Sequence, residues 1–76
     1  MTRKLPRITA AETIKALEKT SFSFSRQSGS HKIYKNKEVK RTTVPYHSGK
    51  ILHPKTLKSI LRDADLTIDN LIALLK

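Results

Sequence analysis

The spacing of the apolar residues changes twice along this chain, and this constrains the fold more than any other feature. Between residues 10 and 19 the spacing is that of a helix, with Ile14 and Leu17 on one face. Phe22 and Phe24 then alternate with serines, which is the two-residue period of a strand. From residue 54 onward the helical spacing returns. The sequence therefore predicts a helix, a group of strands and then further helices.

Short local signals mark where the helices begin. Thr9 and Glu12 have the spacing of a capping box, in which each side chain bonds the backbone amide of the other, so we expect the first helix at about residues 10–19. Pro54 suits the first turn of the second helix. Thr67 can cap a short apolar third helix, which we expect to pack on the core. The apolar stripe of the second helix consists of Leu57, Ile60, Leu61 and Ala64.

Three strands are expected between the first two helices, at residues 22–25, 31–35 and 39–44. Residues 26–30 are rich in turn formers, and residues 36–38 suit a hairpin connection. Pro45 ends the third strand, because a proline nitrogen cannot donate to a ladder. Short connections between successive strands give an antiparallel meander. The predicted fold class is α+β, a three-stranded antiparallel meander with helices on one face and a short C-terminal helix.

The chain of 76 residues is long enough for one domain and too short for two, so we expect a flexible N-terminus at residues 1–8 and a single domain at residues 9–76. It has no cysteine, which excludes disulfides and cysteine-based zinc sites and suits a reducing cytoplasm. No apolar run follows the charged N-terminus or approaches the ~20 residues of a membrane span, so we expect a cytoplasmic protein.

The net charge of +10 indicates what the chain binds. Basic residues are concentrated between Arg26 and Arg62, where Glu38 is the one acid. This distribution favours affinity for phosphates, although a solvated surface or an acidic protein partner would account for the same charge. The candidates for contacts to RNA phosphates are Arg26, Lys32, Lys35, Lys40 and Arg41.

Histidine is the natural general acid or base near neutral pH, and the chain has three, His31, His47 and His53. A lone histidine is more often an ordinary surface residue. His31 differs because it follows Gly29 and Ser30 at the start of a strand, where a glycine lets the backbone approach a ligand closely. His47 or His53 could assist, but their spacing does not indicate a role.

Other catalytic chemistries find little support in the sequence. We expect no metal site, because six scattered acids are a poor supply for clustered carboxylates. Ser30 and His31 are adjacent on a strand and so point to opposite faces, which argues against a serine hydrolase. A histidine among cations fits RNA cleavage, in which the ribose 2′-hydroxyl is an internal nucleophile. DNA lacks that hydroxyl.

Three segments of the chain have the form of sequence motifs. Residues 26–34, RQSGSHKIY, are similar to the signature R-x-x-G-S-H-x-x-aromatic. Residues 43–47 resemble T-V-P-x-H, and residues 55–66 resemble a helix that contains T-L-x-S-I-L-R-x-A-x-L. In this order, the three segments resemble the motifs of the HicA toxins, also called the YcfA family. The chain departs from the family at residues 21–22, where a glycine and an aromatic residue are frequent, and residues 67–76 extend beyond the shared motifs.

The resemblance implies a double-stranded-RNA-binding-domain-like fold, with the order helix-strand-strand-strand-helix. It also implies an mRNA interferase, an endoribonuclease that needs no metal and no other cofactor. A HicB antitoxin blocks the active site of such a toxin, so we expect a monomer when free and a hetero-oligomer with the antitoxin. The catalytic histidine maps to His31, and the preceding glycine maps to Gly29, with a role in backbone geometry. His47 matches a family histidine to which we assign no catalytic role.

Two other functions stay open from the residues alone. A non-catalytic RNA-binding module would have the same element order and basic surface. A small basic protein that binds an acidic protein or the ribosome would share the charge. The orientation of His31 is also open, because Ile33 and Tyr34 compete for the inward position of their strand. If Tyr34 faces the core, His31 and Ile33 lie on the open face, which suits catalysis.

Overall fold

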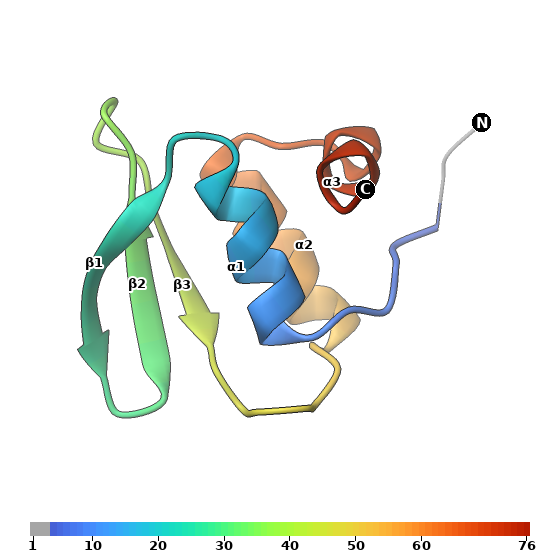
Figure 1. The fold of residues 1–76 in the computed structure, drawn as a ribbon, viewed down its shortest axis with the longest axis horizontal. Helices are drawn as coiled ribbons and strands as arrows, with labels where there is room; N and C mark the ends of the chain where they lie inside the picture. The colour runs from blue at the N-terminus through green and yellow to red at the C-terminus, as the bar shows by residue number, and fades with distance from the viewer. Residues whose placement is uncertain (1–3) are drawn as a thin grey trace.

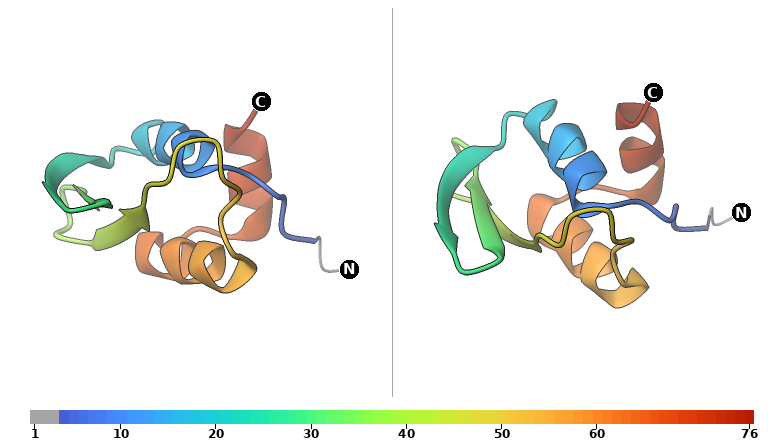
Figure 2. Two further views of the ribbon diagram at one scale, coloured as in Figure 1. Left: turned by 90° about the horizontal axis from the view of Figure 1, so that it is seen from below. Right: turned by 60° about the horizontal axis from the view of Figure 1, so that its bottom comes forward.

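The computed structural model describes residues 4–76, in which three helices and a three-stranded sheet form successive layers. The elements are α1 (Ala10–Glu18), β1 (Ser23–Ser28), β2 (His31–Lys35), β3 (Arg41–Pro45), α2 (Pro54–Ala64) and α3 (Ile68–Leu74). The antiparallel strands lie in the order β1-β2-β3, with α1 and α2 on one face, and no helix among residues 4–76 covers the other face (Figure 1). The third helix, α3, lies on the far side of α1 and α2 from the sheet (Figure 2). The predicted α+β meander is confirmed.

The predicted helix starts are confirmed. The Thr9 hydroxyl accepts from the Glu12 amide at 3.2 Å, and the Glu12 carboxylate accepts from the Thr9 amide at 3.0 Å. Pro54 is the first residue of α2. At the start of α3, the Thr67 side chain accepts from the amide of Asn70, which completes a second capping box. Each start depends on residues at most three positions apart, which is why the sequence predicts them well.

The helix-covered face of the sheet forms the main core. Val44 is fully buried and Tyr34 is 4% exposed, and both pack against apolar side chains of α1 and α2. A second cluster lies between these two helices and α3, where Leu71 is 1% exposed. The expectation that the third helix packs on the core is confirmed. In the part of the chain that the structure describes, no helix has the length and apolar character to cross a membrane.

The bounds of two of the three expected strands are wrong, since the strand expected at residues 22–25 is Ser23–Ser28 and the one expected at residues 39–44 is Arg41–Pro45. The first strand continues to Ser28, because residues 26–28 pair with β2 and only Gly29 and Ser30 form the turn. The third strand begins at Arg41 rather than at Val39. The Asn36 side chain accepts from the amide of Lys40 at 2.9 Å and so closes a connection that is longer than expected, with Val39 in the left-handed region at φ +65°.

The segment that precedes α1 contributes to the core. We expected a flexible N-terminus at residues 1–8, of which residues 1–3 lie outside the described part of the chain. Ile8 is 5% exposed, and its carbonyl accepts from the Leu52 amide at 2.9 Å. Thr9 forms an isolated antiparallel bridge with Ile51. Ile8 is therefore packed into the domain, because the loop before α2 pairs with it.

Candidate active site

His31 lies on the open face of the sheet. Tyr34 is buried beneath α1 and α2, and side chains alternate between the two faces of a strand. Ile33 and His31 therefore point to the bare face, where the sequence alone could not place them. His31 is exposed, and its imidazole has no hydrogen bond or ion pair with any residue in the range 4–76. Both ring nitrogens are free to bind a ligand.

The turn between β1 and β2 fixes the backbone next to His31. Gly29 has φ +58° at the first of two turn positions, where hairpin turns of type II′ place a glycine. The Gln27 side-chain amide donates to the Gly29 carbonyl at 2.8 Å, and the Tyr46 amide donates to the Ser30 carbonyl at 2.6 Å. A Cβ on Gly29 would meet nothing within 4 Å, so the glycine is required by its φ angle and not by lack of space.

A bulge in β1 brings Arg26 to the same face as His31. Phe24 lies opposite Tyr34 and Arg26 lies opposite Ile33, so Ser25 is an extra residue without a partner. In a regular strand Arg26 would share the helix-covered face with Phe24. The bulge reverses this, and Arg26 becomes a diagonal cross-strand neighbour of His31, at a typical separation of about 7–8 Å.

The remaining basic candidates divide between three places. Lys35 and Arg41 are opposite each other at the far end of the open face, four residues along β2 from His31. Lys32 points to the covered face, where its ammonium lies 4.0 Å from the centre of the Tyr46 ring. Lys40 lies outside the strands and forms an ion pair with Asp65 at 3.0 Å. The structure thus brings Arg26, Lys35 and Arg41 together with His31 on one face.

The other two histidines lie in the loop between β3 and α2. His53 is the N-cap of α2, and its Nδ1 accepts from the Lys55 amide at 3.1 Å. This role was not predicted from the sequence, in which the position of His53 immediately before Pro54 is the available signal. His47 is exposed and follows Pro45, the partner of His31 in the β2–β3 ladder, by two residues. Among residues 4–76, no three histidine, aspartate or glutamate side chains form a group that could hold a metal ion.

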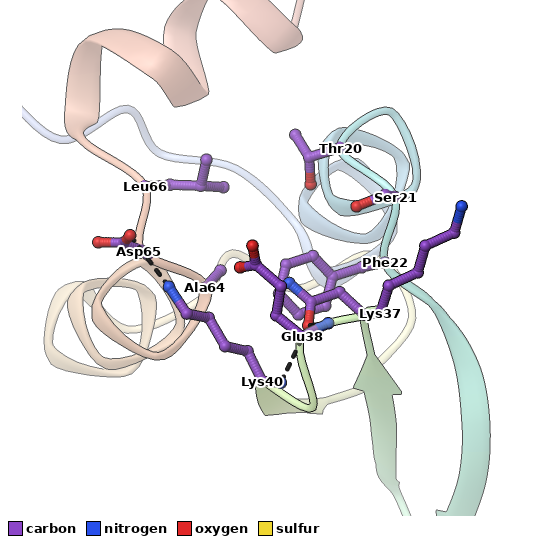
Figure 3. Close-up of a pocket in the computed structure, with 10 residues that line it drawn as sticks. Thr20, Ser21, Phe22, Lys37, Glu38, Lys40, Ala64, Asp65 and Leu66 are labelled. Atoms are coloured by element: carbon purple, nitrogen blue, oxygen red, sulfur yellow. Dashed lines mark hydrogen bonds and ion pairs between the residues drawn. The ribbon is translucent and has the colours of Figure 1, made fainter.

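A polar hollow lies at the opposite end of the sheet from His31. Figure 3 shows the ion pair of Lys40 and Asp65 at its rim, with Phe22 behind it. It lies next to Asn36, the residue that follows β2, whereas His31 is the first residue of that strand. The length of the strand separates the two, so this hollow is not part of the candidate site.

Most of the chain, including the strands that carry the open face, matches a known family. A family model described as the HicA toxin of bacterial toxin–antitoxin systems matches residues 10–66. The chain belongs to the HicA toxin family. It is therefore the toxin of a toxin–antitoxin system, and an antitoxin is its partner. The match includes His31 and the strands β1, β2 and β3 and ends before α3, so α3 lies outside the matched region. No individual curated protein matches the chain.

Proposed function

We propose that this HicA toxin is an endoribonuclease that cleaves mRNA without a metal ion, with His31 as the catalytic residue. The observation that carries the proposal is the exposed His31 on a bare sheet face, with the Arg26 guanidinium on the same face diagonally across the β1–β2 ladder. The family assignment supports a toxin, and the G-S-H segment at residues 29–31 supports this choice of histidine.

The chemistry follows from the groups on that face. His31, as general base, takes the proton of a ribose 2′-hydroxyl, and the resulting oxygen attacks the adjacent phosphorus. The bond from phosphorus to the 5′-oxygen of the next nucleotide breaks, and that oxygen takes up a proton. The products are a 2′,3′-cyclic phosphate and a 5′-hydroxyl. Arg26 stabilises the charge that develops on the phosphate oxygens, because guanidinium forms short, charge-assisted hydrogen bonds to phosphate.

The rest of the open face supplies binding rather than chemistry. Lys35 and Arg41 are exposed, and Lys35 lies about 13 Å along β2 from His31, too far to reach the same phosphate. They suit phosphates farther along the RNA, where lysine and arginine provide the electrostatic part of the affinity. A HicB-type antitoxin that covers this face would block substrate and catalytic histidine together.

The test is an RNA cleavage assay with excess chelator, on protein freed of nuclease contamination. We expect the wild type to cleave and His31→Ala and His31→Gln to be slower by about 10²–10⁴-fold, since general acid–base catalysis contributes that much. Lys58→Ala, which changes an exposed residue of α2, is the control and keeps the wild-type rate. Cleavage by His31→Ala at the wild-type rate contradicts the assignment. Salt-sensitive binding of intact RNA by the wild type would favour the RNA-binding module instead.

A further inference from the structure

We propose that the hollow beside Pro45 is a subsite for the nucleotide next to the phosphate that is cleaved. The inference rests on the proposed function, because it assigns a specificity element to the same RNA site. The residues that line the hollow come from the end of β3, the first turn of α2 and the loop of residues 46–53 between them. Figure 2 shows the course of this loop from β3 to α2. Its volume is about 240 Å³, and its lining consists of Pro45, His47, Lys50, Ile51, Leu52, His53 and Thr56.

The hollow adjoins the catalytic candidate through the sheet. Pro45 lines the hollow and is also the direct partner of His31 in the β2–β3 ladder. The Tyr46 amide, the next donor along the chain, bonds the Ser30 carbonyl at 2.6 Å and holds the start of the loop to the turn before His31. The Cβ atoms of residues directly opposite each other in a ladder, such as His31 and Pro45, are about 4.5–5.5 Å apart. The edge of the hollow at Pro45 is therefore closer to the His31 side chain than the length of one nucleotide.

The polar groups that line the hollow suit a phosphate. They include Lys50 and two histidines, and no acid is among the lining residues. His53 has a defined proton position, because its Nδ1 accepts from the Lys55 amide and the proton of the neutral ring must therefore be on Nε2. The ring is then a donor at Nε2. Lys50 and His53 together provide the N–H groups that phosphate oxygens accept from.

The lining also contains apolar side chains, which suit a ribose or a base. They are Ile51, which is 52% exposed, Leu52 and Pro45. Drug-sized ligands occupy pockets of about 300–1,000 Å³, so a hollow of about 240 Å³ accommodates part of one nucleotide rather than an oligonucleotide. An acidic antitoxin segment is the other occupant with matching charge. A continuous RNA strand is favoured because its next nucleotide follows from the reacting phosphate at His31 without a second binding event.

Binding is tested without cleavage by titrating the wild type and His31→Ala with adenosine 3′-monophosphate and following the imidazole signals by NMR. We expect the signals of His47 and His53 to shift in both proteins. The variant Lys50→Ala/His53→Asn removes the donors but keeps the N-cap, because an asparagine oxygen caps as well as the ring nitrogen does. It should bind the mononucleotide at least about tenfold more weakly, while Lys58→Ala binds as the wild type. Unchanged histidine signals, or equal affinity in the double variant, overturn the subsite.

Specificity is tested by cleavage of a ribodinucleotide and of trinucleotides extended by one nucleotide on either side. For the wild type and for Lys58→Ala, we expect kcat/KM to be higher for one of the two trinucleotides than for the dinucleotide. In Lys50→Ala/His53→Asn, the ratio of kcat/KM for that trinucleotide to kcat/KM for the dinucleotide should be about tenfold lower than in the wild type. An equal ratio in all three proteins overturns the inference while the proposed function stands. If the wild type cleaves nothing, the proposed function fails, and the assignment of a subsite next to the cleaved phosphate fails with it. A double variant that loses only antitoxin binding also overturns it.

Discussion

Arg26 and His31 share the open face of the sheet because β1 contains one extra residue between Phe24 and Arg26. The bulge shifts the pairing by one residue, so that Arg26 lies opposite Ile33 instead of Lys32 and occupies the other face of the sheet. Bulges are frequent next to active sites, where they redirect a side chain. Here the result is a guanidinium diagonally across from an imidazole that has no partner of its own within residues 4–76.

Replacing Arg26 with alanine should lower the rate of RNA cleavage. Loss of one charge-assisted contact to the reacting phosphate costs about 1.4–3 kcal/mol, so we expect kcat/KM to fall about 10- to 100-fold. Arg62→Ala is the matched control, because Arg62 is an exposed arginine in the last turn of α2. Steady-state kinetics on one short RNA measure both variants. If kcat/KM fell equally in the two variants, the net charge of the protein and not the position of Arg26 would account for the loss.

Replacing Gly29 with alanine should destabilise the fold through the backbone alone. The residue has φ +58° and open space around it, so a methyl group adds strain but no clash. A left-handed conformation costs an L-residue about 1–2 kcal/mol, and we expect the free energy of unfolding to fall by about that amount. The free energy of unfolding should fall less in Gly29→Asn than in Gly29→Ala, since asparagine adopts positive φ angles more readily than alanine. Urea denaturation compares the two variants, and a larger loss for asparagine contradicts the explanation.

Replacing Val39 with asparagine should stabilise the protein. Val39 is 84% exposed and has φ +65°, a conformation that is unfavourable for a β-branched side chain. Little packing is lost when the side chain changes, and we expect the free energy of unfolding to rise by about 1 kcal/mol. Val39→Ile keeps the β-branch and serves as the control, with no gain expected. Thermal unfolding of both variants checks this, and a gain in the isoleucine variant would contradict it.

Tyr34 should make the stability depend on pH in alkaline solution. Burial, and then the Coulombic interactions with Glu18 and Tyr46, raise the pKa of its phenol above 10.0. In the unfolded chain the phenol loses its proton near pH 10, before the folded protein does, so stability falls as the pH rises above that value and is unaffected below it. Denaturation of the wild type and of Tyr34→Phe between pH 8 and 11 measures the free energy of unfolding, which should fall less with rising pH in the variant. A difference in the free energy of unfolding between the two proteins that stays constant over this pH range would exclude the effect.

The sequence predicted the elements that depend on neighbouring residues. The capping box at Thr9, the N-cap at Thr67 and the proline at the start of α2 each involve groups within a few positions, so the local pattern is sufficient to locate them. The strand ends were predicted less accurately, since the extent of β1 depends on which residues of β2 it pairs with. The side chain of Asn36 also closes a longer turn than the pattern indicated.

The division of the basic residues could not be predicted from their positions in the chain. Lys32 is adjacent to His31 in sequence, yet it lies on the other face against Tyr46. Lys40 is held by Asp65, which is 25 residues away. His53 is a helix cap rather than a candidate acid or base, a role that exists only because α2 begins directly after it. Folding brings each of these residues close to its partner, so their charge and spacing in the sequence are not sufficient to predict where each of them lies.

The sequence by itself determined the fold class, the helix starts, the basic character and the motif that contains His31, because each of these is a property of residue types at short separations. Only the tertiary structure decided that His31 faces away from the helices, that Arg26 joins it, and that Pro45 connects it to a second hollow. These relationships depend on strand register, and one extra residue at Ser25 is enough to reverse the face of the arginine.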